Sequence, residues 1–381
     1  MRTTLFTSCN RAYEPFAVPH IVSALYHNDD MAVEICVEQP ERFIYDNKDA
    51  LAIVDRHFPD RVLIRAGNFK GMAPNSVRIL EEPHLRSEYT YITDIDILFL
   101  ERNITDIHCA IMEKINLPYS NILRPQMQRL TGLHFTSTAA HYPLVIPEDL
   151  DLKTNDERIL YHLVLSKGLP LPGPDVTFRP IHGYHFSLNR APISMRGKLH
   201  WNLRPKFLEP YRELIASPLW QEIVPHLGLG YRVALLTLET ALQTQNQEID
   251  LFQPGQLKEV FRQASSVAAA VPAPDGETSH ADAALRSTLI KERRFAEAIE
   301  VQRRMLQRSP LDPMQHHQMA WLQTAMRDRE AALAHELIAC TLAPDDGRYA
   351  DTAAKYRAAW KREMAAESAT ATAATDASPP R

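Results

Sequence analysis

The stretch Tyr89-Thr90-Tyr91-Ile92-Thr93-Asp94-Ile95-Asp96-Ile97-Leu98-Phe99-Leu100 places two aspartates, one residue apart, in an apolar run typical of a buried β-strand. Side chains of a strand alternate between its faces, so Asp94 and Asp96 are predicted to point one way and Ile95 and Ile97 into the core. Two carboxylates this close repel each other unless a cation lies between them. A hard divalent ion takes carboxylate oxygens and leaves positions for phosphate oxygens. The stretch therefore predicts a metal and diphosphate site; the alternative is a strand that runs into a polar loop with both aspartates exposed.

Around this stretch, short β-rich runs alternate with helical patterns. Strands are predicted at about residues 3–8, 32–38 and 61–65, and a helix at 15–26. Such alternation indicates an α/β fold, in which a mostly parallel sheet is flanked by helices. Ligands of open sheets bind beyond the carboxyl ends of the strands, where Thr7-Ser8-Cys9-Asn10 and Asp94-Ile95-Asp96 both fall. Two separated segments are therefore expected to form one site.

The composition is that of a globular protein. The chain has 381 residues, enough for two domains, of which 45% are hydrophobic and 8% aromatic. A net charge of -5 argues against a general nucleic-acid binder. No apolar run approaches the ~20 residues that span a bilayer, and the amino terminus lacks a secretory apolar region, so a cytoplasmic protein without a transmembrane segment is expected. The four cysteines form no Cys-x-x-Cys pair and predict neither a zinc site nor a disulfide framework.

The last third of the chain carries a repeat. Residues 253–283 are rich in Pro, Ala, Ser and Gly and are predicted to be a linker that follows a first domain of residues 1–252. Beyond it, a shift of 34 residues places Ala298 on Ala332, Ile299 on Leu333 and Pro310 on Pro344. This is the tetratricopeptide period, so residues 284–363 resemble tetratricopeptide repeats with a closing helix near 349–363. The alternative is a plain antiparallel helical hairpin. The tail, 364–381, is predicted to be disordered.

Further motifs of the first domain follow the order of a known enzyme family. The opening stretch 4–13, Thr-Leu-Phe-Thr-Ser-Cys-Asn-Arg-Ala-Tyr, looks like a first strand and its nucleotide loop. Arg78 looks like a basic residue placed against a nucleotide-sugar donor. Thr131-Gly132-Leu133-His134-Phe135 is similar to an Asn-Ser-Gly strand that lies beside the sugar of such a donor. With the Asp-x-Asp stretch, about the first 200 residues resemble the family eight retaining glycosyltransferases, the group of glycogenin and bacterial lipopolysaccharide galactosyl- and glucosyltransferases. The resemblance implies a GT-A fold and a donor site of Thr7, Ser8, Asn10, Tyr13, Arg78, Asp94, Ile95, Thr131, Gly132 and Arg190.

Two later motifs extend the resemblance. Asp156-Glu157-Arg158-Ile159-Leu160 resembles the family's Asp-Gln-Asp-x-Leu-Asn, and His182-Gly183-Tyr184-His185 lies where its His-Tyr-x-Gly-x-x-Lys-Pro-Trp begins. The resemblance implies that Asp94, Asp96 and His182 hold Mn²⁺ or Mg²⁺, with His185 as the alternative to His182. Two carboxylates and a neutral imidazole suit Mn²⁺. The sequence departs from the family at Glu157, at Arg158 and at Leu188, where a phosphate-binding Lys is expected and Arg190, Arg196 or Lys198 could substitute.

Each of these residues also has a structural interpretation. Asp156 and Glu157 could start a helix capped by Thr154 or Asn155, since acidic residues are favoured there. Either histidine could be a buried core residue. Arg78 would by default be a solvated helix residue.

The sequence thus predicts a metal-dependent glycosyltransferase, a hexosyltransferase in residues 1–252, that moves a sugar from a nucleotide donor, first of all a UDP-sugar, to the hydroxyl of a glycan, lipid-linked or protein acceptor. By the resemblance, Asp156 orients the donor sugar, Glu157 flanks the anomeric carbon, and configuration is retained. A Glu there could also deprotonate a hydroxyl, which leaves inversion open. The helical module is expected to bind a protein partner. The rivals are a sugar nucleotidyltransferase, although no Gly-rich loop follows the first strand, and an inactive domain that serves as a partner-binding module.

Overall fold

The computed structural model describes residues 1–11, 13–176, 180–186, 198–200, 203–244, 248–250, 276–309, 312–343, 345–359 and 362. The chain divides into two compact units, the first made of residues 1–187 and 202–227 and the second of 188–201 and 228–381. The first unit thus ends before residue 252, where the sequence puts the end of the first domain. The domain boundaries from the sequence stay a prediction, because residues 251–275 lie outside the described part.

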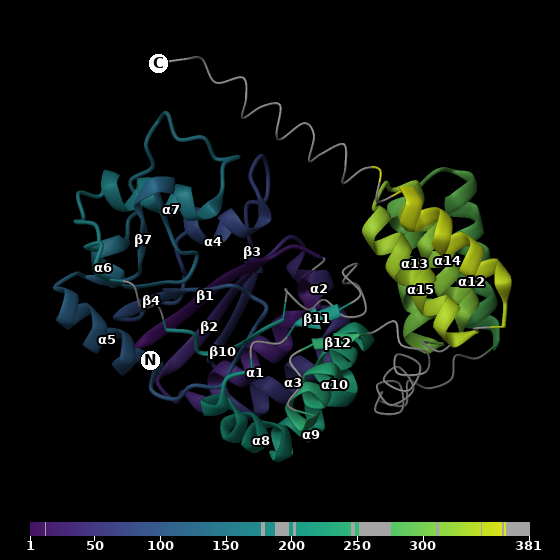
Figure 1. Cartoon of the computed structure of the whole chain (residues 1–381), viewed down its shortest axis with the longest axis horizontal. Coiled ribbons are helices and arrows are strands. Elements are labelled where there is room, and N and C mark those ends of the chain that lie inside the picture. The colour runs from purple at the N-terminus through teal and green to yellow at the C-terminus, as the bar shows by residue number, and fades with distance from the viewer. Residues whose placement is uncertain are drawn as a thin grey trace. The chain divides into compact units, whose positions relative to one another are not determined.

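The first unit is built on a six-stranded sheet of order β3-β2-β1-β4-β9-β6. Figure 1 labels β1 to β4 of this sheet. Strands β1 to β4 are parallel, and β9 is antiparallel to both β4 and β6. The bounds are β1 Thr3–Cys9, β2 Met31–Val37, β3 Val62–Ala66, β4 Tyr89–Ile92, β6 Tyr119–Ser120 and β9 His134–Ser137. Every residue of β1 and β2 is buried, because both faces of a parallel sheet are covered by helices.

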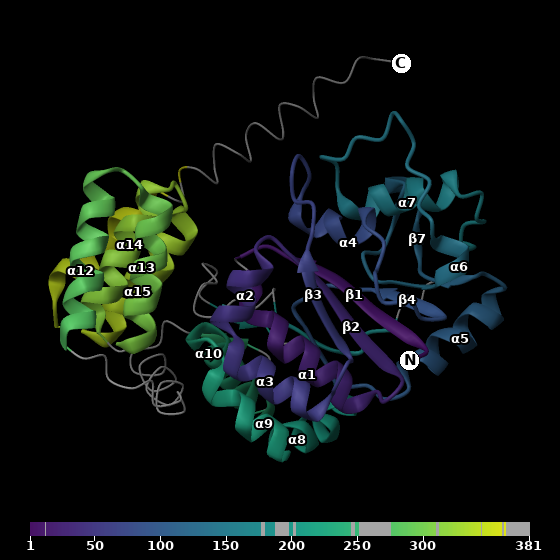
Figure 2. The same cartoon turned by 180° about the vertical axis from the view of Figure 1, so that it is seen from behind.

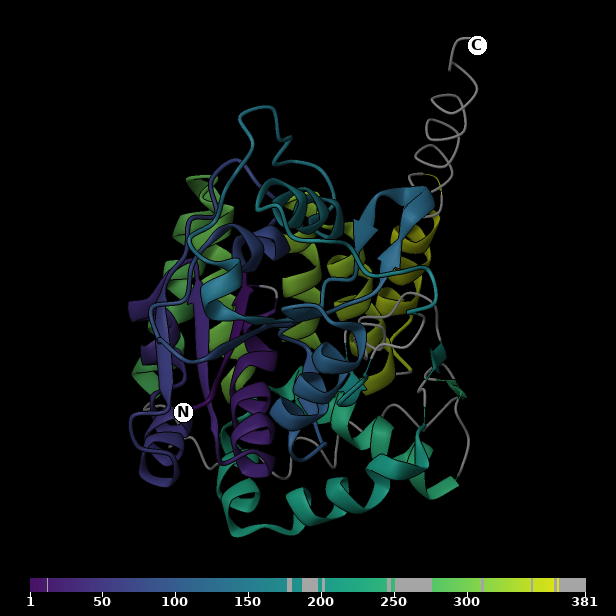
Figure 3. The same cartoon turned by 90° about the vertical axis from the view of Figure 1, so that its left-hand side faces the viewer.

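Helices cover the two faces of this sheet. On one face lie α1 (Ala17–His27), which packs against β2, and α3 (Lys48–His57) (Figures 2 and 3). On the other face, Phe6 of β1 and Cys36 of β2 pack against α4 (Val77–Leu80) and α7 (Asp156–Ser166) in one apolar cluster. The predicted α/β class, a mostly parallel sheet flanked by helices with a helical region after it, is confirmed. This arrangement is consistent with a GT-A type fold.

The first unit contains further helices and strands. The helices are α2 Pro40–Asp46, α5 Ile104–Ile115, α6 Thr138–His141, α8 Leu208–Ala216 and α9 Pro218–Ile223, with single 3-10 turns at Glu14–Phe16, Pro74–Ser76, Pro125–Met127, Pro205–Phe207 and Val224–His226. The strands are β5 Ile97–Phe99, which pairs with β10 Gly183–His185, and β7 Leu123–Arg124, which pairs with β8 Arg129–Leu130. The strands predicted at about 3–8, 32–38 and 61–65 correspond to β1, β2 and β3, and the helix predicted at 15–26 corresponds to α1.

The stretch Tyr89–Leu100 does not form one strand. Strand β4 ends at Ile92, residues 93–96 connect the strands with a turn at 95–96, and β5 begins at Ile97. Strand β5 leaves the sheet and pairs with β10 instead. The alternation of a single strand therefore does not explain why Asp94 and Asp96 point together, and the explanation must come from the turn and from β10.

The second unit contains a repeated helix pair. Its helices are α10 Leu229–Thr244, α12 Gly276–Lys291, α13 Phe295–Arg308, α14 Pro313–Ala325 and α15 Arg329–Leu342, and its strands β11 Lys198–His200 and β12 Glu248–Asp250 pair with each other. A shift of 34 residues places the first and last residues of α13 on those of α15. Arg293, just before α13, and Arg327, just before α15, both have positive φ. The same turn thus recurs one period later.

Ala298 and Ala332, which the sequence aligns, are both fully buried. Pro310, Pro344 and the tail 364–381 lie outside the described residues, whereas 276–283, predicted as linker, already belong to α12. None of the helices that the structure describes is both long and apolar enough to cross a membrane.

Candidate active site

The site lies where the strand order reverses, between β1 and β4, which is where open parallel sheets bind ligands. Hydroxyls at the end of β1 tie the neighbouring segments together. Thr7 Oγ1 donates to the carbonyl of Thr93 at 2.8 Å, and Ser8 Oγ donates to the carbonyl of Pro74 at 3.0 Å. Ser8 Oγ also accepts from the backbone N–H of Arg78 at 3.2 Å. The end of β1 therefore positions both the aspartate turn and α4.

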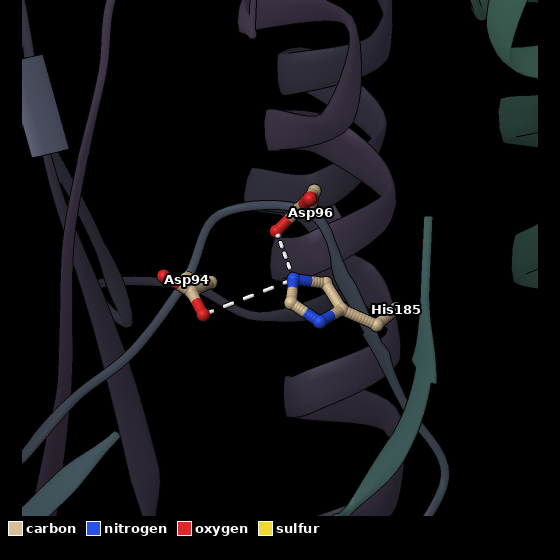
Figure 4. Close-up of side chains that lie close together, drawn as sticks. All are labelled: Asp94, Asp96 and His185. Atoms are coloured by element: carbon tan, nitrogen blue, oxygen red, sulfur yellow. Dashed lines mark hydrogen bonds and ion pairs between the residues drawn. The ribbon is translucent and has the colours of Figure 1, made fainter. Parts of the chain in front are cut away.

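Asp94, Asp96 and His185 form a cluster that could hold a cation, since one ligand atom from each lies within 4.8 Å of the others (Figure 4). Nε2 of His185 is 2.9 Å from Oδ1 of Asp96 and 3.8 Å from Oδ2 of Asp94. The side chain of Asp96 is 3% exposed, against 29% for Asp94 and 37% for His185, so the cluster is closed behind Asp96 and open beside the other two. Two carboxylates and one imidazole are a donor set that fits Mn²⁺ or Mg²⁺.

Strand β10 brings His185 to the aspartates. It is antiparallel to β5, with His185 opposite Ile97, and the N–H of Phe186 donates to the carbonyl of Asp96 at 2.8 Å. The register requires a glycine at the other end of β10, because a Cβ on Gly183 would lie 1.8 Å from the carbonyl oxygen of Leu98. The pairing of β10 with β5 therefore explains why His185 lies beside Asp96.

The structure reverses the order of preference between the two histidines. His182 is 2% exposed and lies away from the aspartates, with Nδ1 2.8 Å from Oε2 of Glu101 and Nε2 2.9 Å from Nε2 of His108. Burial lowers the pKa of His182, and the hydrogen bond to Glu101 offsets only part of this effect. Residues three apart on a strand face opposite sides, so His182 and His185 cannot share a site. The predicted ligand His182 is thus a core histidine, and its alternative His185 joins the cluster.

Arg78 links the aspartate turn to α7. Its Nη2 lies 2.6 Å from Oδ1 of Asp94 and 3.0 Å from Oδ2 of Asp156, and its side chain is 4% exposed. Burial works to lower the pKa of Arg78, but Asp94, Asp156 and Asp96 outweigh it and the pKa is raised. A Cβ on Gly132 would lie 3.0 Å from this nitrogen, so the backbone of Gly132 approaches the pair closely. Arg78 is therefore a buried cation of the site and not a solvated helix residue.

Asp156 and Glu157 begin α7, as the structural interpretation of the motif predicted. Asn155 is the cap, with Oδ1 accepting from the N–H of Glu157 at 3.0 Å. The two carboxylates separate at this point. Asp156 points to Arg78, while Oε2 of Glu157 lies 3.1 Å from Nη1 of Arg124. Asp156 is thus linked to Asp94 through Arg78, whereas Glu157 pairs with Arg124.

The other predicted donor residues come from several segments: Asn10 and Tyr13 follow β1, Ile95 lies between β4 and β5, and Thr131 follows β8. Oδ1 of Asn10 is buried without a hydrogen-bond partner in the described part of the chain. The ring of Tyr13 is 6.0 Å from that of Phe16, and Ile95 is buried in the turn. Thr131 is also buried, and its Oγ1 donates to Oδ1 of Asn121 at 2.7 Å. Arg190 lies outside the described residues, as do Leu188 and Arg196, and Lys198 belongs to β11 of the second unit.

His20 is a neighbour of the site that the sequence did not suggest. It lies on α1, is 1% exposed, and its Nδ1 is 3.1 Å from the carbonyl of Ile97, directly after the turn. Burial lowers its pKa to about 4, although Asp96 and Asp94 raise it in part. The signal that the sequence offered was a histidine in a mostly apolar helix.

No protein-family model matches this chain, and no curated protein is significantly similar to it. Among solved structures, the chain is similar to residues 1–349 of TarS from S. aureus, with 12% sequence identity over 88% of this chain and 90% of that chain and a TM-score of 0.33. A TM-score of this size does not support a shared chemistry. The function therefore has to be inferred from the residues of the site.

Proposed function

We propose that this protein is a metal-dependent glycosyltransferase that transfers a hexosyl group from a nucleotide-sugar donor, a UDP-sugar, to an acceptor hydroxyl. The observation that carries the proposal is the cluster of Asp94, Asp96 and His185 at the reversal of strand order, joined through Arg78 to Asp156. A cation site alone is common, but a cation site with a buried arginine and a further carboxylate beside it suits a diphosphate with a sugar attached.

Asp94, Asp96 and His185 would hold Mn²⁺ or Mg²⁺. A bound divalent ion neutralises the negative charge that develops on the diphosphate as the sugar leaves. The exposure of the three residues supports this assignment, because Asp96 is closed off while Asp94 and His185 are open to a ligand. Phosphate oxygens could complete the coordination from that open side.

Arg78 and Asp156 would act on the donor itself. Arg78 is a fixed buried cation, so it stabilises negative charge in the leaving diphosphate without having to reorganise. Asp156 has one carboxylate oxygen on Arg78 and can accept hydrogen bonds from sugar hydroxyls. The absence of a side chain at Gly132 lets its backbone lie against the Arg78–Asp156 pair.

Retention of configuration is part of the proposal, because it requires no strong base. Glu157, which flanks the anomeric carbon in this proposal, forms an ion pair with Arg124 at 3.1 Å. To act as a general base in an inverting reaction, the carboxylate would first have to leave this arginine. The pair therefore favours retention.

The second unit would bind a protein partner or the acceptor, which is a glycan, a lipid-linked molecule or a protein. The recurrence of α13 as α15 after 34 residues, with the same positive-φ turn before each, supports a tetratricopeptide-like module at residues 284–363.

Two measurements on the full-length protein test the proposal. Calorimetric titration with UDP should show binding that strengthens at least tenfold with Mn²⁺, and incubation with a panel of UDP-sugars and Mn²⁺ should release UDP slowly without an acceptor. UDP affinity that is independent of Mn²⁺, with no release from any sugar nucleotide, would contradict the proposal. Diphosphate release from UTP and a sugar 1-phosphate would instead identify a nucleotidyltransferase.

A further inference from the structure

His182 is held on both sides of its ring although it binds nothing in the candidate site. Glu101 lies 2.8 Å from Nδ1, and His108 of α5 lies 2.9 Å from Nε2. The ring also packs edge-on against Tyr91 at 5.7 Å and stacks on Phe99 at 6.4 Å. Residues from β4, β5 and α5 thus converge on this one side chain.

The hydrogen bonds of this group are mutually consistent. Glu101 can only accept, so Nδ1 of His182 carries the proton and Nε2 accepts from the N–H of His108. Burial lowers the pKa of both imidazoles, which agrees with this neutral arrangement. The other oxygen of Glu101 accepts from Lys206 Nζ at 2.8 Å. Each polar contact of His182 therefore has one direction, and the ring has one orientation.

The backbone of His182 is fixed as well. Its carbonyl accepts from the N–H of Leu100 at 2.7 Å and from that of Glu101 at 3.2 Å. These bonds continue the ladder between β10 and β5 beyond Gly183. His182 therefore lies directly before β10, and His185 is the last residue of β10, beside the aspartates.

Strand β10 needs such an anchor. In the part of the chain that the structure describes, three residue pairs join β10 to β5, and these two strands form a sheet of their own. Two-stranded pairings of this size are marginal without tertiary contacts. A shift of β10 by one residue would turn His185 to the opposite face, away from Asp94 and Asp96.

We propose that His182 is a positioning residue: bound by Glu101 and His108, it fixes β10 in the register that places the His185 imidazole, roughly 10 Å along the strand, beside Asp94 and Asp96. This inference rests on the proposed function, because it concerns the cation site of that function. It assigns His182 a role in metal binding without direct contact to the metal.

The test measures Mn²⁺ affinity of the full-length protein by calorimetry, without nucleotide or sugar, next to its melting temperature. His182→Ala and Glu101→Ala should each weaken Mn²⁺ binding about tenfold, the size typical of residues that orient a metal ligand. Glu101→Gln keeps an acceptor for His182 and should bind Mn²⁺ as the wild type does. His27→Ala is the matched control, since it removes another buried imidazole of the same unit, at the end of α1.

The outcomes separate this inference from the proposed function. Wild-type affinity in both alanine variants would overturn the positioning role while leaving the cation site intact, and Glu101→Ala decides the question if His182→Ala does not fold. An equal loss in Glu101→Gln and Glu101→Ala would also overturn it, because the charge of Glu101 would then be acting directly on the cation. A wild-type protein that binds no Mn²⁺ would refute the proposed function itself.

Discussion

Arg78 and Asp94 form an ion pair within the candidate site, with Nη2 of Arg78 2.6 Å from Oδ1 of Asp94. The second oxygen of Asp94, Oδ2, lies 3.8 Å from Nε2 of His185. One carboxylate therefore belongs to the proposed cation site and to the arginine that also contacts Asp156. The shared Asp94 therefore connects the proposed cation site to Asp156, the residue proposed to bind the donor sugar.

The first prediction concerns the stability that this arginine provides. Arg78→Met leaves Asp94 and the 7% exposed side chain of Asp156 without their counter-ion. Removing one partner of a buried ion pair costs about 3 kcal/mol, and urea denaturation should show a loss of this size. Arg124→Met is the control, because its pair with Glu157 is half-exposed and should contribute less than about 1 kcal/mol. Equal losses in the two variants would mean that the Arg78 pairs are not maintained in solution.

The second prediction concerns the ligands. Asp94→Asn, Asp96→Asn and His185→Ala should each abolish the gain in UDP affinity that Mn²⁺ produces. Each asparagine variant removes one negative charge from the cluster, and His185→Ala removes its imidazole. Titration calorimetry with and without Mn²⁺ measures this gain, and circular dichroism checks that the fold is intact. Asp55→Asn, an exposed aspartate of α3, should behave as the wild type does. A folded His185→Ala protein with an undiminished gain would remove His185 from the ligand set.

The third prediction concerns acid sensitivity. Burial lowers the pKa of His27 to about 4, with Arg102 lowering it further and Glu213 opposing. Below the unfolded pKa of about 6.5, the unfolded chain takes up a proton at this position that the folded chain refuses until near pH 4. The free energy of unfolding therefore falls as the pH drops through this window.

Replacing His27 removes this contribution. Between pH 7 and pH 5 the wild type should lose up to about 2 kcal/mol more stability than His27→Leu, as measured by urea denaturation at both pH values. The comparison with the variant cancels the effect of the other titrating groups. Identical slopes in the two proteins would show that water reaches His27 in the folded state.

The sequence predicted those parts of the fold and site that depend on local patterns. Apolar runs locate β1 and β2, and acidic residues after a capping Asn155 locate the start of α7. The choice between His182 and His185 depended on β10 pairing with β5, a contact between segments more than eighty residues apart that no local pattern encodes. The burial of Arg78 likewise depends on Asp156, which is brought to it only by the packing of α7 on α4.

The last prediction distinguishes the two carboxylates that begin α7. If Asp156 and Glu157 act on the sugar and not on the cation, Asp156→Asn and Glu157→Ala should lower turnover of a UDP-sugar by about 100-fold or more, while Mn²⁺-dependent UDP affinity stays within about twofold.

Their partners differ, and this allows a finer test. Asp156→Asn keeps an oxygen that can accept from Nη2 of Arg78, so this nitrogen should stay near Asp94. Arg124→Met removes the partner of Glu157 and leaves Glu157 itself unchanged. In a retaining reaction Arg124→Met should change turnover little. If Glu157 were the base of an inverting reaction, freeing it from Arg124 should raise turnover, and the anomeric configuration of the product, read by proton NMR, should be opposite to that of the donor. Wild-type turnover in both Asp156→Asn and Glu157→Ala would leave these residues with the role of a helix start alone.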